Sequence, residues 1–143
     1  MGSNPTVIRD ATRVELAKDR GLIDDVIERI LALAAKHGFD AGSGFAIRLA
    51  IEEAITNAFV HGNSTMPHDA TVTVEYRVSD CSVDVAVEDR GPGFNPDRLP
   101  DPTREENLSK PSGRGVMLMR AYMTEVVFND SGNRVRLTYR RES

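Results

Sequence analysis

The chain has 143 residues, 40% of them hydrophobic and 28% charged, which is the size and composition of one water-soluble globular domain with a buried core. Its formal net charge of −4, without an evident basic face, argues against nucleic acid as a direct partner. The single cysteine, Cys81, excludes an internal disulfide, and the lack of a signal peptide or a membrane-spanning apolar run predicts a cytoplasmic protein without a membrane partner.

Hydrophobic periodicity predicts a strand and two helices in the first half of the chain. Residues 6–18 have the pattern of a strand. Residues 19–37 repeat apolar side chains every three or four positions, as a helix does, and Gly38 is its expected stop. After a short link, Ser43 is the candidate N-cap of a second helix, which extends to Gly62.

The second half is predicted to hold two hairpins, separated by a long loop and a helix. Residues 95–112 carry four prolines and many charges, so we expect an irregular loop of the kind that often forms a lid. A helix follows at residues 116–123. The strands are expected at residues 71–78, 82–88, 125–129 and 134–140.

This order of elements predicts an α+β fold. Strands joined by hairpins form a mixed, mainly antiparallel sheet, and helices on one face complete a two-layer α/β sandwich. No linker is long enough to separate two domains. We therefore expect residues 1–143 to form one domain, with residues 1–5 disordered or left over from cloning.

The helix that ends at Gly62 has an unusual polar face. Glu53, Asn57 and His61 follow one another at intervals of four residues, so they lie along one side of the helix. The rest of the helix forms a broad apolar face that can pack on a sheet. A carboxylate one turn before a carboxamide, on so apolar a helix, needs an explanation. The apolar positions are Ile47, Ala50, Ile51, Ala54, Ile55 and Ala58.

The chemistry of these side chains and of a downstream turn suggests a nucleotide. The carboxamide oxygen of Asn57 is a hard, neutral ligand suited to Mg²⁺, and the carboxylate of Glu53 could accept a proton from an attacking hydroxyl or water. Asp89, at a strand end, could accept hydrogen bonds from an exocyclic amino group such as that of adenine. Gly91 and Gly93 would let the backbone approach a flat ring closely.

A second pair of glycines stands where the last helix begins. Gly113 and Gly115 leave free backbone N–H groups at the positive end of the helix dipole, which is a phosphate site. Arg114 or Lys110 could add positive charge there. Together with the polar helix face and the preceding turn, these residues describe a pocket for a magnesium nucleotide.

Each feature alone has a plainer interpretation. Glu53 and Asn57 could be a solvated helix face, Asp89 could open an ordinary turn, and residues 113–115 could be a flexible entry to a helix. His61 is better explained as a C-terminal cap, favoured by the helix dipole, than as a catalyst or ligand. The order of the features along the chain is what favours the nucleotide interpretation.

The three motifs, at residues 53–58, 89–94 and 113–115, resemble the N, G1 and G2 boxes of the GHKL ATPase and kinase superfamily. The resemblance covers nearly the whole chain, because the order of strands and helices also fits the superfamily's Bergerat fold. Within that superfamily, Glu-Ala-x-Thr-Asn-Ala followed by His-Gly is similar to the small anti-sigma factor serine kinases.

The resemblance implies a role for each motif. Asn57 would coordinate the Mg²⁺ that bridges the phosphates of ATP, and Glu53 would act as general base on a serine of a partner protein. That partner would be an anti-sigma antagonist, a sigma factor would be a further partner, and members usually form homodimers. The residues implied in binding adenine and closing the lid over the phosphates are Asp89, Gly91, Gly93, Gly113 and Gly115.

The chain departs from the family pattern at two positions. Family members often carry a basic lid residue where this chain has Pro111, so Lys110 or Arg114 would have to substitute for it. A threonine near the adenine commonly follows the glycine of the last hairpin, whereas here Asn133 follows Gly132.

Three alternatives to a serine kinase remain open. A nucleotide-gated partner-switching module with little catalysis is disfavoured by Glu53, because a pure binder needs no base. The ATP-binding domain of a histidine kinase is disfavoured because 143 residues leave no room for the helical hairpin that bears the phospho-accepting histidine. A zinc hydrolase using Glu53 and His61 lacks a third ligand.

Overall fold

The computed structural model describes residues 9–92 and 113–141. The start of the predicted first strand and the predicted loop at residues 95–112 lie outside the described residues. In chain order the elements are β1 (Arg9–Leu16), α1 (Arg20–Lys36), α2 (Ala41–Asn57), a π-helical turn η1 (Ala58–Gly62), β2 (Val72–Ser79), β3 (Ser82–Glu88), α3 (Gly113–Tyr122), β4 (Glu125–Phe128) and β5 (Arg134–Arg140).

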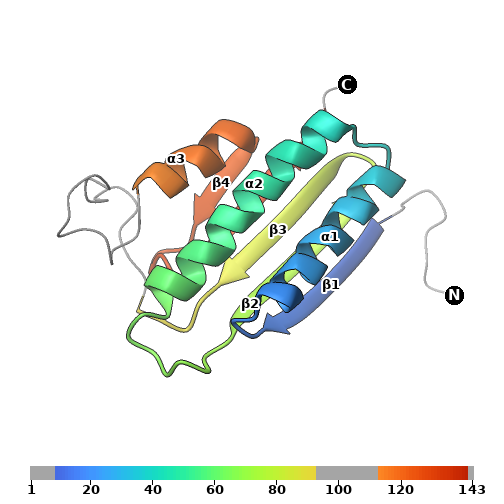
Figure 1. Ribbon diagram of the computed structural model, residues 1–143. Helices are drawn as coiled ribbons and strands as arrows, with labels where there is room; N and C mark the ends of the chain where they lie inside the picture. The colour runs from blue at the N-terminus through green and yellow to red at the C-terminus, as the bar shows by residue number, and fades with distance from the viewer. Residues whose placement is uncertain (1–8, 93–112, 142–143) are drawn as a thin grey trace, which may run out of the picture.

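The described strands form one sheet in the order β1-β2-β3-β5-β4, and every neighbouring pair is antiparallel. The helices cover one face of this sheet, with α2 between α1 and α3 (Figure 1). The predicted two-layer α+β architecture is therefore confirmed. The sheet was expected to be mixed and mainly antiparallel. In its described part every pairing is antiparallel.

Alternation along the strands places the core between the two layers. On β3, Val83, Val85 and Val87 are buried beneath the helices, while Asp84 and Glu88 project from the opposite face. The apolar positions expected on α2 are all buried, which confirms that face of the helix. They are Ile47, Ala50, Ile51, Ala54, Ile55 and Ala58.

The first two helices begin at aspartates. Asp19 caps α1 by accepting a hydrogen bond from the Leu22 N–H at 3.0 Å, and Asp40 caps α2 by accepting one from the Ser43 N–H at 2.8 Å. The prediction that Ser43 is the N-cap is therefore wrong. The better-placed carboxylate three residues earlier takes that position, and the Ser43 hydroxyl instead bonds the Tyr139 hydroxyl at 2.9 Å.

The second helix ends in a π-helical turn. Its end at Gly62 agrees with the prediction, but residues 58–62 hold the wider π spacing rather than the regular α spacing. The C-cap is Asn63, so the interpretation of His61 as the cap is wrong. The stacking of His61 on Asn57 was predicted from regular α-helical spacing, and that spacing does not hold in this turn.

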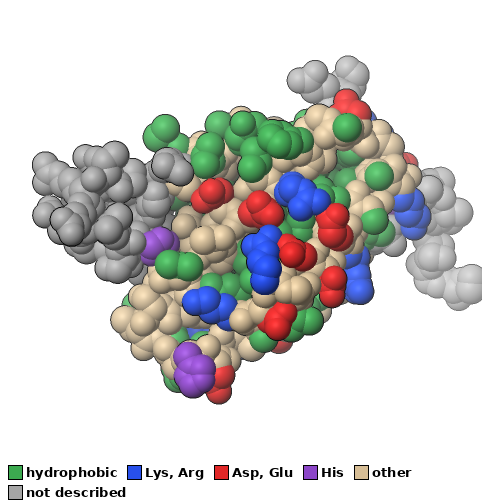
Figure 2. Space-filling model, viewed as in Figure 1, with side chains coloured by type: hydrophobic (Ala, Val, Ile, Leu, Met, Phe, Trp, Pro, Cys, Tyr) green, Lys and Arg blue, Asp and Glu red, His purple; other side chains and the backbone are tan. Residues whose placement is uncertain are grey.

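The outer surface of the helix layer is charged. Arg48 pairs with Glu28 on α1, and Arg20 pairs with Glu52 on α2 at 3.2 Å. Figure 2 shows acidic and basic side chains gathered over α1 and α2. Exposed pairs of this kind contribute little to stability, so this surface is an ordinary solvated face. Glu53, one residue after Glu52, forms no ion pair with a described residue and belongs to a different side of α2.

Candidate nucleotide-binding site

Glu53 and Asn57 on α2 converge on the first turn of α3. A Cβ atom added to Gly115 would lie 3.0 Å from the Glu53 Oε2 and 3.1 Å from the Asn57 Nδ2. A side chain at this position would therefore crowd both groups, and glycine avoids the crowding. The first turn of α3, at the positive end of its helix dipole, therefore lies against the carboxylate and the carboxamide.

The amide nitrogen of Asn57 is buried without a hydrogen-bond partner among the described residues. Such a group costs free energy of about 1–3 kcal/mol, so its retention needs a reason. A carboxamide can turn to present nitrogen or oxygen, and this position therefore suits a phosphate oxygen or a hard cation. The residues present fit a magnesium nucleotide at this point.

Asp89 is a buried carboxylate directly after β3. Its side chain is only 7% exposed, and this burial raises its pKa to about 6. The Gly91 N–H, which donates to the Asp89 Oδ1 at 2.8 Å, acts in the opposite direction, and the neighbouring charge of Glu88 adds to the rise. A buried acceptor of this kind is suited to bind an amino group of a flat ligand.

Two glycines let the end of η1 and the Asp89 turn touch. A Cβ on Gly62 would lie 2.1 Å from the Asp89 Oδ2, and a Cβ on Gly91 would lie 1.7 Å from the Gly62 carbonyl oxygen. Neither position tolerates a side chain without displacement of the other segment. The polar face of α2 is thereby held next to Asp89.

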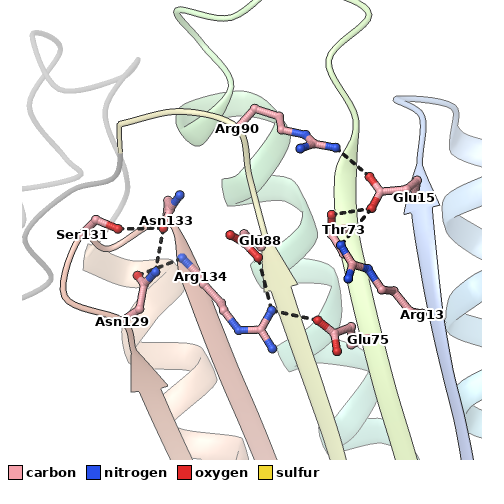
Figure 3. Close-up of polar contacts among 10 residues, drawn as sticks. All are labelled: Arg13, Glu15, Thr73, Glu75, Glu88, Arg90, Asn129, Ser131, Asn133 and Arg134. Carbon is pink, nitrogen blue, oxygen red and sulfur yellow. Dashed lines mark hydrogen bonds and ion pairs between the residues drawn. The ribbon is translucent and has the colours of Figure 1, made fainter.

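Asn63 holds the same junction together from the side. Its side chain is 8% exposed. Its Oδ1 accepts from the Arg90 N–H at 2.7 Å, and its Nδ2 donates to the Thr71 carbonyl at 3.3 Å. The Arg90 side chain points away from the site toward Glu15 at 3.0 Å (Figure 3). Asn63 was not predicted as a site residue, because the sequence shows it only as a polar residue that follows a helix.

A pocket joins these parts beneath the hairpin between β4 and β5. Its wall includes Asn57 from α2, Asp89 after β3, and Asn133 before β5. The Asp89 N–H donates to the Asn133 carbonyl at 2.9 Å, so the two residues are fixed relative to each other. The other lining residues are mostly apolar; they are Ala54, Ala58, Val87, Met119, Phe128, Gly132, Arg134 and Val135.

A family model described as a histidine kinase-like ATPase domain matches residues 16–139. The chain belongs to this histidine kinase-like ATPase family.

Relatives place this ATPase-type chain in a particular branch of the family. It is 31% identical over 101 residues to a protein named anti-sigma F factor from Geobacillus stearothermophilus, covering 68% of this chain and 67% of the relative. It is 32% identical over 97 residues to the anti-sigma F factor of Geobacillus kaustophilus, covering 65% of this chain and 64% of the relative. The resemblance to GHKL anti-sigma factor kinases is therefore confirmed.

The ATPase fold brings most of the predicted site residues together. Glu53, Asn57, Asp89, Gly91 and Gly115 come from three separate motifs and lie around one junction. Their chemical roles stay predictions.

The remaining predicted residues are placed only in part. Gly113 begins α3, so the glycines lie inside the first turn of that helix rather than before it. Gly93 and Lys110 lie outside the described residues, and so does the side chain of Arg114. No described helix is long and apolar enough to cross a membrane, and no three described His, Cys, Asp or Glu side chains form a metal cluster.

Proposed function

We propose that this ATPase-family chain is a Mg-ATP-dependent protein serine kinase of the anti-sigma factor type. The observation that carries the proposal is the convergence of Glu53 and Asn57 on Gly115, because Asn57 also lines the pocket that Asp89 lines. The names of the relatives support the anti-sigma role. The predicted cytoplasmic location and single ATP-binding domain are part of the same proposal.

The residues of the pocket would divide the binding of the nucleotide between them. The Asp89 carboxylate accepts a hydrogen bond from the adenine amino group, and Gly91 holds that carboxylate through its N–H and its close contact with the Gly62 carbonyl. The first turn of α3, at Gly113 and Gly115, presents backbone N–H groups to the phosphates. Asn57 would hold the Mg²⁺, which supplies charge neutralisation on the phosphate oxygens.

Glu53 has the position of a general base in this proposal. It is half-buried beside Gly115, and no described residue donates a hydrogen bond to its carboxylate, which leaves the carboxylate available to an entering hydroxyl. Glu53 accepts the serine proton while the serine oxygen bonds to the γ-phosphorus. The bond from that phosphorus to the β–γ bridging oxygen breaks, and ADP leaves.

An exposed apolar surface on α2 and α3 supports a protein substrate over a small molecule. Met117 on α3 is 70% exposed and Phe45 on α2 is 60% exposed, and Phe45 contacts the ring of Tyr122 edge-on. Figure 2 shows the hydrophobic side chains gathered at the α3 side of the helix layer. Apolar surface of this kind is typical of protein interaction sites. The proposed partners are an anti-sigma antagonist as substrate and a sigma factor. Homodimerisation stays a prediction from the resemblance.

A transfer assay with labelled nucleotide tests the proposed function. The purified chain is incubated with Mg²⁺, γ-labelled ATP and a panel of antagonist proteins from the same cell, and the label is analysed chemically. Acid-stable phosphoserine on an antagonist is the expected result. Acid-labile label on the chain itself would contradict it in favour of a histidine kinase. Tight ATP binding without any transfer would contradict it in favour of a partner-switching module.

A further inference from the structure

Glu15, at the end of β1, accepts hydrogen bonds from three side chains of other segments. The Thr73 hydroxyl on β2 donates to its Oε1 at 2.8 Å, and the Thr71 hydroxyl donates to its Oε2 at 3.1 Å. The Arg90 guanidinium, in the turn after β3, donates to the same Oε2 at 3.0 Å (Figure 3). Because β2 lies between β1 and β3 in the sheet, the ion pair of Arg90 with Glu15 spans a whole strand.

Arg90 is held at both of its ends. Its backbone N–H donates to the Asn63 Oδ1 at 2.7 Å, while its guanidinium binds Glu15. That N–H belongs to the peptide group that joins Asp89 to Arg90, and the next N–H, of Gly91, donates to the Asp89 Oδ1 at 2.8 Å. A displacement of Arg90 therefore moves both the peptide group beside Asp89 and the donor that holds its carboxylate.

The ion pair is better suited to orient the turn than to stabilise the fold. The Arg90 and Glu15 side chains are 55% and 43% exposed, and an ion pair at such a surface contributes little to the free energy of unfolding. The hydrogen bond from Thr73 is the main cause that lowers the pKa of Glu15, and Thr71 and Arg90 act in the same direction. The carboxylate is therefore ionised at neutral pH, where it keeps its contact with Arg90.

We propose that Glu15 is a positioning residue of the nucleotide site, which acts through Arg90 to hold the Asp89 turn in the arrangement that binds adenine. Glu15 is not among the described residues that line the pocket, so its effect on the nucleotide passes through the turn. A turn that is fixed before the ligand arrives loses less conformational entropy on binding, and a loosened turn binds more weakly. This inference rests on the proposed function, because it requires ATP beside Asp89.

Calorimetric titrations of the full chain with Mg-ATP test this inference in Glu15→Gln, Arg90→Gln and the double variant. Glu15→Gln removes the charge that binds Arg90 but leaves an amide oxygen to accept from Thr73, so that link between β1 and β2 is kept. Each single variant is expected to bind Mg-ATP at least about threefold more weakly than the wild type. The double variant is expected to bind as the weaker single variant does, because both changes break one contact.

Arg13→Gln is the matched control. The Arg13 guanidinium lies 3.6 Å from the Glu15 Oε1, but it comes from β1 itself and makes no link to the Asp89 turn. Its loss removes a positive charge from the same carboxylate and is expected to leave the Mg-ATP affinity within about 1.5-fold of the wild type.

The transfer assay separates positioning from a general loss of structure. In Glu15→Gln the KM for ATP is expected to rise at least about threefold, while kcat at saturating ATP stays within about 1.5-fold of the wild type, because a bound nucleotide still meets Glu53 and Asn57. The midpoint of urea unfolding is expected to stay that of the wild type. A lower midpoint with an unchanged KM would assign Glu15 to the stability of the sheet and overturn the inference.

Two further results would overturn the inference while the nucleotide site stands. One is an Mg-ATP affinity equal to that of the wild type in Glu15→Gln or in Arg90→Gln. The other is a pair of losses that add in the double variant, which would show that the two residues act separately. A wild type that binds no Mg-ATP would instead overturn the proposed function, and this inference with it.

Discussion

Gly62 lies so close to Asp89 that a Cβ atom on it would be 2.1 Å from the Asp89 Oδ2. A glycine is required here because the two segments approach closely. Its backbone conformation does not require a glycine, because the described residues with positive φ are Gly38 and Gly132 and not Gly62. The contact joins the end of the helix that carries Glu53 and Asn57 to the end of the strand before Asp89. The relative position of the proposed base and the adenine-binding carboxylate therefore depends on it.

Gly62→Ala is expected to weaken ATP binding and to destabilise the fold. The added methyl group must displace Asp89 or the end of η1, and overpacking of this kind costs about 1–3 kcal/mol. We expect at least about tenfold weaker ATP binding by calorimetry and a lower midpoint in urea. Gly44→Ala is the matched control, because a Cβ on Gly44 in α2 meets no atom within 4 Å. That control should raise stability by about 0.5–1 kcal/mol. Unchanged ATP binding in Gly62→Ala would show that the contact does not position Asp89.

Asp89→Asn is expected to stabilise the free protein at neutral pH. Burial raises the pKa of Asp89 from 3.8 to about 6, so the folded state prefers the protonated form. Its contribution to stability is therefore fully present below pH 3.8 and is lost as the pH rises through about 6. The neutral asparagine does not carry this penalty, and the shift corresponds to at most about 3 kcal/mol. Urea unfolding at about pH 7.5 and about pH 4.5 should show a gain for the variant that shrinks at the lower pH.

The same titration predicts how ATP binding depends on pH. Only the ionised Asp89 is a pure acceptor for the adenine amino group, so the affinity of the wild type should rise as the pH increases through about 6. Calorimetric titrations between about pH 5 and about pH 8 measure this change. In Asp89→Asn the affinity should be low and lack this rise. An equal rise in both proteins would assign the titration to another group.

Asn63→Ala is expected to loosen the Asp89 turn. The Arg90 N–H loses its acceptor at 2.7 Å, and a hydrogen bond of this kind contributes about 0.5–1.5 kcal/mol to stability. Urea unfolding and ATP titration should both show a loss. Ser64→Ala removes a hydrogen bond from the exposed neighbouring residue to the His61 carbonyl and is expected to change stability by less than about 0.5 kcal/mol. Equal stability of the two variants would show that Asn63 does not hold the Asp89 turn.

Regular periodicity and turn residues allowed most of the fold to be predicted. The valines of β3 and the isoleucines of α2 are buried where alternation and helical spacing place them. Gly38, with a φ of +89°, ends α1 as expected. The N-cap of α2 was predicted wrongly, because Asp40 and Ser43 both favour a cap and local sequence does not decide which carboxylate or hydroxyl the tertiary structure uses.

The site was predictable as a set of motifs but not as an arrangement. Helical spacing identifies Glu53 and Asn57, and glycine turns identify Asp89 and Gly115. The π turn after Asn57 could not be predicted, because a periodicity argument assumes regular spacing. Contacts between distant segments, such as Asn63 with Arg90, also leave no local pattern in the sequence.

Phosphoryl transfer by Glu53→Gln tests the proposed function most directly. Single-turnover transfer from Mg-ATP to a serine-bearing antagonist is measured together with ATP affinity. Glu52→Gln is the matched control, because that carboxylate pairs with Arg20 on the outer surface of the helix layer. ATP affinity is expected to stay within about threefold of the wild type for both variants, and transfer is expected to fall at least about 100-fold in Glu53→Gln alone. Transfer by Glu53→Gln at the wild-type rate would contradict the proposal that Glu53 is the general base.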